Sequence, residues 1–487
     1  MAAKRRQAWR FPGLGPSLAT LLLVSGCSTL ERQGVVEGVE TPAPPPPKPF
    51  EVADSAERKR LIAMFGGEYR WPKAENHLND VLAKLARSSD TPNQPYRVTI
   101  LNSGVINAFA LPSGDLFVTR GLLALANDTA EIAAVMAHEI GHVTARHAYL
   151  RAEQEKTAQV ITRAANVIQS RQKGEQVESS SALSLAGFSR QQELEADRIG
   201  IRAAARAGYD PYGASRFLNS LERASELRNA VMGQKSDRPD LLASHPSTPE
   251  RIAAALGEAR QIGAPGIGDA GRAAYLAAID GMTFGDDPKD GTILGRRFVH
   301  PRLGFTFEAP EGFVLENSQS AVLGVANGGA EALRLDSVHA PEGKSLSGYL
   351  TSGWIDGLLP SSIESGQVNG LPAVFADARA GEWNFRVAVI AYRDDLYRVI
   401  FAVKALTAEA QQKFAASIGS FRALAPEEVK LAAPLRLRIV VAGKQDTLDT
   451  LAARMATGDH AAEQLRTLNA IDDDGVKPGT SYKIVAY

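Results

Sequence analysis

His138-Glu139-Ile140-Gly141-His142 reads as the pattern HExxH, inside a stretch that is expected to be helical. Helical residues four apart lie on one face, so the imidazoles of His138 and His142 can reach one metal ion. Glu139 stands beside them, where its carboxylate can take a proton from a metal-bound water. The plain alternative is a solvated helix that happens to carry two histidines. The pattern therefore predicts two metal ligands and a base, and it requires a third ligand from elsewhere.

The helix around this motif is framed by recognisable local signals. Tyr96–Leu101 and Asp115–Thr119 alternate like strands, with a turn before Asp115. Asp128 can cap the next helix, and Glu131 three residues later completes the cap signature. Beyond the motif, residues 149–172 predict a charged amphipathic helix. Ala182–Phe188 form a small apolar patch that could cover the cleft as a lid or pack as an ordinary loop.

One known source of a third ligand is a further histidine, six residues after the second and with a glycine between them. Those positions are Ala148 and Ala145 here, so this pattern fails. His147 is the nearest remaining histidine. At about 100° per residue, His147 lies nine steps from His138 and roughly on the opposite helix face, so we expect a surface or packing side chain.

A glutamate on a second helix is the other known source, and Glu193-Leu194-Glu195-Ala196-Asp197 offers it. Glu193 and Asp197 share a helix face, whereas Glu195 points away and is expected to be solvated. Glu193 would therefore bind the metal. Asp197 would accept a hydrogen bond from the free N–H of a ligand histidine.

Four ordered motifs carry a family resemblance, covering roughly residues 60–260. They are NAFALPSGDLFVTRGLL at 107–123, HEIGHVTARH at 138–147, SRQQELEADRIG at 189–200 and HPSTPERI at 245–252. This region resembles the CAAX-prenyl-protease-like gluzincin zinc metallopeptidases, in the soluble branch of the BepA and HtpX type. The resemblance implies a mainly helical domain with a small edge β-sheet, one Zn²⁺ per chain, and Glu139 as the base. The implied zinc ligands are His138, His142 and Glu193.

The same resemblance gives His245 and Arg251 a place near the metal. It favours a zinc-proximal His245, whose neutral ring could fill the open coordination position and displace water. Binding the oxyanion and capping a helix are the alternatives for His245. Arg251 could bind a substrate carboxylate or form a salt bridge with the carboxylates of the zinc helices, and we favour the salt bridge.

These residues predict a zinc endopeptidase that acts on misfolded or stalled cell-envelope proteins. A substrate strand would pair with an edge strand near Asn107–Leu111 or Leu116–Thr119, an arrangement that suits unfolded polypeptides. Two other functions remain open. One is a zinc-containing, chaperone-like assembly factor, and the other is a peptidoglycan-associated binding or processing protein.

The N-terminal sequence predicts that the protein is located in the cell envelope. A basic start is followed by an apolar run at 18–24, which is too short to span a bilayer. The next residues resemble a bacterial lipobox, which implies a signal peptide at 1–26 and lipidation of Cys27. Ser28 then favours attachment to the outer membrane, facing the periplasm of a diderm bacterium. The proline-rich residues 27–53 would form a semi-rigid tether.

The whole chain reads as an α+β protein of several domains. Its 487 residues suggest about three domains of ordinary size. We expect a metallopeptidase domain at 54–262, a glycine-rich linker at 263–297 and a separate α+β domain at 298–425. The last of these is weakly similar to PsbP-like domains and is expected to bind a substrate or partner. No basic stripe is present, so a nucleic-acid partner has no support.

The final segment, 434–487, is predicted to follow a β-α-α-β order that resembles a LysM module. The resemblance implies binding to the N-acetylglucosamine glycans of peptidoglycan. The match is partial, because Gln445 stands where the pattern has glycine. A structural cap on the preceding domains is the alternative.

Overall fold

The computed structural model describes residues 55–151, 188–232, 245–318 and 320–487. Several expectations lie outside these residues: the signal peptide at 1–26, Cys27, the tether at 27–53, and most of the predicted helix and apolar patch between 149 and 188. Phe50–Tyr487 cluster as one compact unit. Within the described ranges, no helix is both long and apolar enough to cross a membrane.

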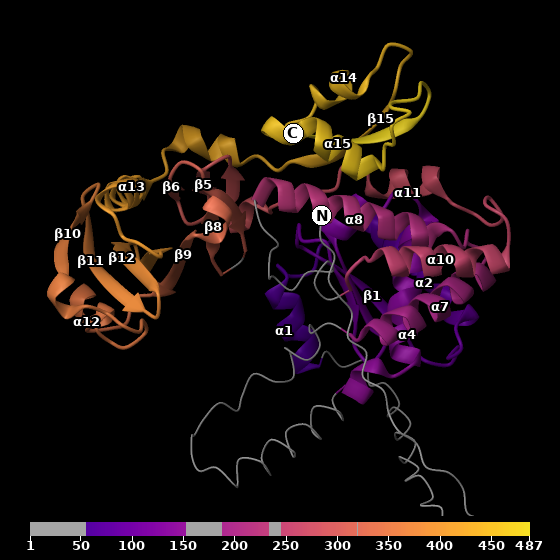
Figure 1. The fold of residues 1–487 in the computed structure, drawn as a ribbon, viewed down its shortest axis with the longest axis horizontal. Helices are drawn as coiled ribbons and strands as arrows, with labels where there is room; N and C mark the ends of the chain where they lie inside the picture. The colour runs from indigo at the N-terminus through magenta and orange to yellow at the C-terminus, as the bar shows by residue number, and fades with distance from the viewer. Residues whose placement is uncertain (1–54, 152–187, 233–244, 319) are drawn as a thin grey trace, which may run out of the picture. The chain divides into compact units, whose positions relative to one another are not determined.

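The first region is mainly helical, as expected (Figure 1). Its helices are α1 (Ala56–Met64), α2 (Pro72–Ser88), α3 (Arg120–Leu125), α4 (Thr129–Thr144), α7 (Arg190–Arg206), α8 (Gly213–Met232), α10 (Pro249–Ile262) and α11 (Arg272–Ile279). Every residue of α4 from Thr129 to His142 is buried. A helix that is buried on all sides forms the centre of a core, and α4 is the helix that carries HExxH.

A three-stranded sheet lies beside this core, with β1 (Arg97–Leu101), β2 (Ala108–Ala110) and β3 (Asp115–Thr119) in the order β1-β3-β2. Strand β3 pairs with both neighbours, parallel to β1 and antiparallel to β2. The expectation that Leu116–Thr119 could receive a substrate strand is therefore wrong, because both edges of β3 are already paired. Among the described residues, β2 lies at the edge of the sheet opposite β1, and it is the remaining candidate for pairing with a substrate strand.

The segment expected to be a linker, 263–297, is only partly one. Its glycine-rich start has no helix or strand, but α11 follows at Arg272–Ile279. Tyr275, Leu276 and Ile279 of α11 are buried in the same hydrophobic cluster as α4. Much of the expected linker therefore belongs to the core around α4, since these apolar side chains find burial there.

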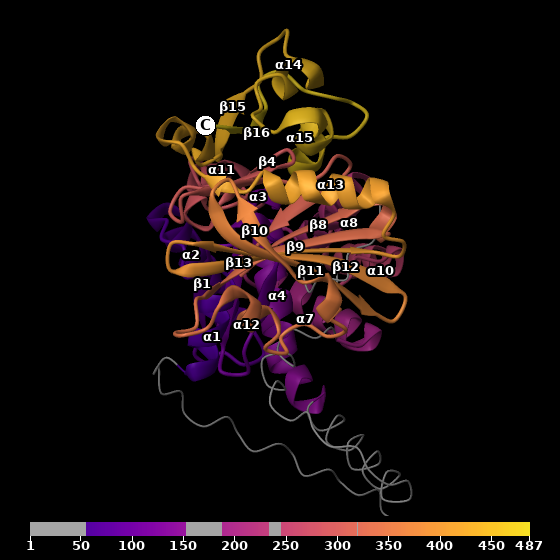
Figure 2. The same ribbon diagram turned by 90° about the vertical axis from the view of Figure 1, so that its left-hand side faces the viewer.

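The β-rich region that follows contains two antiparallel sheets. One has seven strands in the order β10-β11-β12-β13-β9-β8-β7, and the other has four in the order β14-β6-β5-β4 (Figure 2). The strands are β4 (Thr292–Leu294), β5 (Arg297–His300), β6 (Phe305–Glu308), β7 (Val314–Asn317), β8 (Val322–Ala326), β9 (Glu331–His339), β10 (Glu364–Val368), β11 (Leu371–Ala380), β12 (Trp383–Tyr392), β13 (Asp395–Val403) and β14 (Arg422–Ala423). Helices α12 (Leu346–Leu350) and α13 (Ala408–Gly419) complete the region. Phe414 of α13 stacks on Phe401 of β13, which joins helix and sheet in one core.

The last segment has the predicted β-α-α-β order. It consists of β15 (Arg436–Val441), α14 (Leu448–Ala452), α15 (Ala461–Asn469) and β16 (Ser481–Ala486), with β15 antiparallel to β16. Leu437 of β15 and Val485 of β16 are fully buried, in the same hydrophobic cluster as residues of α4 and α11. This segment therefore shares its core with the first, mainly helical region.

Lys483 of β16 marks this shared core most clearly. Its side chain is completely buried, and its ammonium group donates to the carbonyl oxygens of Ala124, Leu125 and Ala126 at 2.8, 3.1 and 2.7 Å. Those carbonyls lie at the C-terminal end of α3, where a helix leaves its last acceptors unpaired. Lys483 satisfies them, just before α4 begins.

Candidate metal centre

Helix α4 starts where the sequence predicted. The Asp128 side chain accepts a hydrogen bond from the Glu131 N–H at 2.8 Å, which is an N-cap contact. The Glu131 carboxylate accepts from the Asn127 N–H rather than from the cap residue itself. Arg216 of α8 also binds Asp128, at 2.9 Å. These contacts fix the first turn of the helix, ten residues before His138.

Two glycines let α7 lie unusually close to α4. A Cβ on Gly141 would lie 2.9 Å from the carbonyl oxygen of Ala196, and one on Gly200 would lie 2.8 Å from the backbone nitrogen of His138. Neither approach leaves room for a side chain, because real Cβ atoms do not sit that near to backbone atoms. The two backbones therefore touch, and Glu193 of α7 reaches the histidines of α4.

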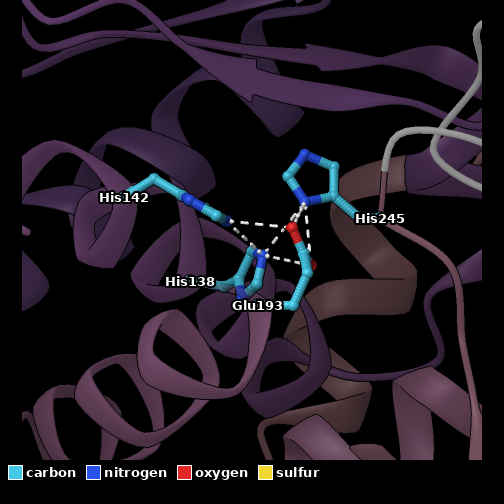
Figure 3. Close-up of side chains that lie close together, drawn as sticks. All are labelled: His138, His142, Glu193 and His245. Atoms are coloured by element: carbon cyan, nitrogen blue, oxygen red, sulfur yellow. Dashed lines mark hydrogen bonds and ion pairs between the residues drawn. The ribbon is translucent and has the colours of Figure 1, made fainter. Parts of the chain in front are cut away.

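The side chains of His138, His142, Glu193 and His245 converge on one point (Figure 3). One potential ligand atom from each lies within 4.8 Å of all the others, and all four residues are buried. The Nε2 atoms of His138 and His142 are 3.0 Å apart. Glu193 oxygens lie 3.5 Å from Nε2 of His138 and 3.6 Å from Nε2 of His142. The predicted ligand set is thus brought together from two helices, with His245 as a fourth member.

Each histidine of α4 has a partner behind its metal-facing nitrogen. Nδ1 of His138 lies 2.9 Å from an oxygen of Asp197. Nδ1 of His142 lies 2.9 Å from Nδ1 of His147, so one of these two atoms is the donor and the other the acceptor. Such partners fix the tautomer and the orientation of a ligand histidine.

The position of His147 differs from the expectation that it lies opposite His138. Helix α4 ends at Thr144, and Arg146 has a positive φ of 55°. This break turns the chain back, so that His147 is 1% exposed and contacts His142. Its other nitrogen lies 3.4 Å from Glu195, whose side chain is otherwise half exposed. No local signal marked the break, because Ala and Arg both favour helices.

Phe188 also packs against the ring of His142. The two rings stack with their centroids 4.0 Å apart. Phe188 is the last residue of the apolar patch that was expected either to cover the cleft or to pack. It lies just before Ser189, which caps α7.

Arg251, from α10, binds both carboxylates of α7. It donates to Asp197 through Nε and Nη2, both at 2.8 Å, and its Nη1 lies 2.9 Å from a Glu193 oxygen. All three side chains are buried. A bidentate pair in this setting is strong and directional. Of the two alternatives for Arg251, the structure shows the salt bridge to the carboxylates.

His245 enters the cluster from the segment that leads into α10. Its Nδ1 lies 2.9 and 3.1 Å from the two Glu193 oxygens, and its Nε2 lies 3.9 Å from Oε1 of Glu139. Ser247 anchors this segment by donating to the carbonyl oxygen of Leu218, and Thr248 caps α10. The alternative that His245 caps a helix is wrong, because Thr248 takes that place.

Burial and nearby charges shift the pKa values of the site's titratable groups in different directions. Burial raises the pKa of Glu139 and holds the pKa of His142 well below its usual value. For Glu193, burial is outweighed by the hydrogen bond from His245 and by nearby positive charges, so its pKa is lowered. For His138, burial is likewise outweighed, by the hydrogen bond to Asp197, and its pKa is raised.

These residues fit a zinc ion. Imidazole nitrogens with one carboxylate are a known donor set for catalytic zinc. Oε1 of Glu139 is buried and has no hydrogen-bond partner among the described residues. A buried carboxylate oxygen left without a partner is costly unless a further group, such as water on the metal, binds it.

Comparisons with known proteins agree with this geometry. The family profile described as peptidase family M48 matches residues 72–259. The beta-barrel assembly-enhancing protease of Escherichia coli is 28% identical over 201 residues, which cover 39% of this chain and 40% of that protein. A putative beta-barrel assembly-enhancing protease of Vibrio cholerae is 32% identical, covering 39% and 40%. The mitochondrial metalloendopeptidase OMA1 of Arabidopsis thaliana is 31% identical, covering 41% of each chain.

The chain thus spans about two fifths of the length of the curated relatives that it matches. Among solved structures, a cyanobacterial PsbP from Synechocystis is 16% identical and covers 27% of this chain and 94% of that one. Its TM-score is 0.23, which does not establish a shared fold. The PsbP-like character of 298–425 stays a prediction, as does the LysM identity of 434–487.

Proposed function

We propose that this chain, whose residues 72–259 match the profile of peptidase family M48, is a zinc-dependent endopeptidase. The observation that carries the proposal is the unpartnered Oε1 of Glu139 beside four buried donor atoms. His138, His142 and Glu193 would hold the zinc, which when bound supplies an acidic water and a Lewis acid for the peptide carbonyl.

Glu139 is the general base of this proposal. Burial raises the pKa of its carboxyl group above the usual value, and a carboxylate positioned beside the reacting water can act as a general base. Its carboxylate would take a proton from the attacking water and deliver that proton to the nitrogen of the leaving amine. His138 and His142 are held in place by Asp197 and His147 meanwhile, so the base and the ligands keep a fixed geometry.

The substrate would be an extended polypeptide that pairs with the edge strand β2. Among the described residues, Ala108 and Ala110 of β2 pair with β3 on one side only, and β2 packs against α4. Main-chain hydrogen bonds to an edge strand bind extended segments with little regard to their side chains. Folded proteins seldom offer such segments, so the proposed clients are misfolded or stalled polypeptides.

We propose the cell envelope as the place of action. The lipobox-like stretch ending at Cys27 supports attachment to the outer membrane by lipid, on the periplasmic side of a diderm bacterium. The names of the bacterial relatives, which are beta-barrel assembly-enhancing proteases, favour envelope proteins as clients. A labelled-lipid incorporation assay on wild type and Cys27→Ala tests the anchor: incorporation into both proteins would refute it.

His245 is proposed as a gate on the metal. Its ring, which lies within ligand distance of the other donors, can take the position that the attacking water needs. Moving His245 away would then open the site. Ser247 and Thr248 anchor the chain just after His245, through a hydrogen bond to Leu218 and the cap of α10.

One experiment decides the proposed activity. Wild type and Glu139→Gln are loaded with zinc and given an unfolded protein such as casein, and the fragments are read by mass spectrometry. We expect both proteins to hold zinc and only the wild type to cleave. Equal cleavage by the two would reject Glu139 as base. If zinc-loaded wild type cleaves nothing while suppressing aggregation of the client, the chain would be an assembly factor rather than a protease.

A further inference from the structure

Behind the ligand His142, a chain of hydrogen bonds leads through His147 to Glu195. Nδ1 of His147 lies 2.9 Å from Nδ1 of His142, and Nε2 of His147 lies 3.4 Å from an oxygen of Glu195. Both rings are buried, whereas the Glu195 side chain is 51% exposed. The chain thus joins a carboxylate at the surface to the nitrogen behind the metal-facing atom of His142.

Metal binding by His142 fixes where the protons in this chain must lie. A neutral imidazole carries one proton, so a ring that offers the lone pair of Nε2 to a metal holds its proton on Nδ1. Nδ1 of His142 must then be the donor of the pair, and Nδ1 of His147 the acceptor. The single proton of a neutral His147 is left on Nε2, the nitrogen that faces Glu195.

The carboxylate at the far end favours the same arrangement. An ionised carboxylate can only accept hydrogen bonds, so Glu195 favours a proton on Nε2 of His147. The opposite tautomers would place the His147 proton on Nδ1 and the His142 proton on Nε2, where it would exclude a metal. They would also set the lone pair of His147 Nε2 against a carboxylate oxygen. Both ends of the chain therefore require the tautomers that leave Nε2 of His142 free for a metal.

The backbone adopts an unfavourable conformation where it brings His147 to this place. Helix α4 ends at Thr144, and Arg146 has a φ of 55°, in the left-handed region. This region is costly for a residue that has a side chain, and such conformations concentrate at functional sites. A continued helix would have carried His147 to the far face, away from His142.

Packing alone does not require an imidazole at position 147. The ring of His142 already stacks on Phe188, with the centroids 4.0 Å apart. An apolar side chain could fill the place of His147 without burying two nitrogens that each need a partner. Both nitrogens of His147 do have partners, one of them on a ligand histidine, which is how residues that orient metal ligands are arranged.

We propose that His147 and Glu195 are positioning residues for the ligand His142: Glu195 selects the tautomer of His147, and His147 selects that of His142. The proposal rests on the proposed zinc-dependent function, because it concerns how that site holds its metal. It gives Glu195 a role, although the sequence alone predicted a solvated side chain. A carboxylate thus orients His138, whereas a second imidazole orients His142.

The zinc affinity of the full chain, measured by competition with a chelator at fixed pH, tests His147. His147→Leu removes the acceptor and should weaken zinc binding by about 10–100-fold. His147→Gln offers a carbonyl oxygen to the Nδ1–H of His142 and should recover most of this affinity. If His147 only filled space, the apolar Leu would serve at least as well as the polar Gln, and that result would overturn the proposal.

A matched pair of variants tests Glu195. Glu195→Leu should weaken zinc binding, by less than His147→Leu does, because water can still accept from Nε2 of His147 at this half-exposed edge. Glu226→Leu makes the same change at an exposed position of α8 and should bind zinc as wild type does. Equal affinities of Glu195→Leu and Glu226→Leu would overturn the role of Glu195.

The proton positions themselves give a readout that a merely structural role would not move. NMR of the isotope-labelled histidine ring nitrogens in the zinc-loaded chain should show His147 with its proton on Nε2 and His142 with its proton on Nδ1. The signals of His147 are assigned by their loss in His147→Gln. A proton on Nδ1 of His147 would overturn the proposal, even if His147→Leu fails to fold.

The outcomes separate this inference from the function on which it rests. If wild type binds zinc but cleaves no unfolded protein, the endopeptidase function fails, and the affinities still decide the positioning role. If wild type cleaves and Glu139→Gln does not, while His147→Leu binds zinc as tightly as wild type, only the positioning role is rejected. If wild type binds no zinc, both fail.

Discussion

The ammonium group of Lys483 lies 2.7 Å from the carbonyl oxygen of Ala126, which joins the strand β16 to the end of the helix before α4. Burial lowers the pKa of Lys483 and raises that of Glu131, which lies in the first turn of α4. The Asn469 side chain fixes the backbone of Lys483: its oxygen accepts from the Lys483 N–H, and its amide nitrogen donates to the Lys483 carbonyl oxygen. A residue far from the motif in sequence thus supports the start of the motif's helix.

Lys483→Met should lower the free energy of unfolding by about 2–4 kcal/mol, because three buried carbonyl groups lose their donor. Urea denaturation followed by tryptophan fluorescence measures the change. Lys477→Met is the matched control: its ammonium group pairs with Asp474 on the surface, where an ion pair contributes little. Equal stability of Lys483→Met and wild type would show that this contact does not hold the two segments together.

Asp197→Asn should weaken zinc binding by about 10–100-fold, because His138 and Arg251 both lose a charged partner. Competition with a zinc chelator at fixed pH measures this affinity. Glu226→Gln removes a carboxylate at an exposed position of α8 and should bind zinc as wild type does. A normal affinity in Asp197→Asn would argue against the role of Asp197 behind His138.

Glu139→Gln should reduce peptide hydrolysis by about 10²–10⁴-fold at unchanged zinc content, since the amide cannot accept the proton from water. Metal analysis of the purified variant and a fluorogenic peptide assay measure the two quantities. Glu226→Gln, at an exposed position on α8, is the control for loss of one carboxyl group. Loss of zinc along with activity would instead indicate a structural role for Glu139.

If His245 is the proposed gate, His245→Ala should keep zinc and raise the rate of cleavage, because the variant lacks the ring that would occupy the position of the attacking water. The rate should be compared at equal zinc occupancy, with a short peptide that needs no further opening of the site. An unchanged rate together with unchanged zinc content would contradict the gate. A lower rate would favour the alternative that His245 binds the oxyanion.

The stability of the β-rich region should fall as the pH drops from about 6.5 to about 4. Burial, with Arg302 nearby, lowers the pKa of His300 to about 4, and Leu303 donates its N–H to Nδ1 of this ring. The folded chain keeps the ring neutral in this window, whereas the unfolded chain takes up a proton, so acid favours unfolding by up to about 3 kcal/mol.

His300→Asn keeps an acceptor for Leu303 and cannot take up this proton, so it should flatten the pH dependence of the melting temperature in that window. His339→Asn, which alters a ring that is 81% exposed, should leave the dependence as in wild type. Parallel curves for His300→Asn and wild type would mean that other groups cause the acid sensitivity.

Much of the site was predictable because its spacing follows helix periodicity. His138 and His142 are four residues apart, as are Glu193 and Asp197, and each pair does lie on one face. His147 was misplaced by the same reasoning, since the periodicity holds only while the helix continues. The turn at Arg146 depends on tertiary packing, which local sequence does not reveal.

The order of strands and the docking of the last segment were not predictable in this way. Alternation marked both β1 and β3 as strands, but alternation does not say which strand lies in the middle. The β-α-α-β order of the final segment was also readable. Its burial against the peptidase core was not, because Leu437 and Val485 look like the ordinary apolar residues of any small module.

The shared core has a consequence for the order of events during synthesis. A ribosome makes the zinc ligands first and β16 some three hundred residues later, at roughly 5–20 residues per second. Until Ser481–Ala486 arrive, the end of α3 lacks Lys483 and the core around α4 lacks Val485. The nascent chain therefore contains the complete HExxH motif well before the contacts of β16 with α3 and with the core around α4 can form. Such a delay would restrain a protease from cutting neighbouring unfolded chains, or its own, while it is still being made.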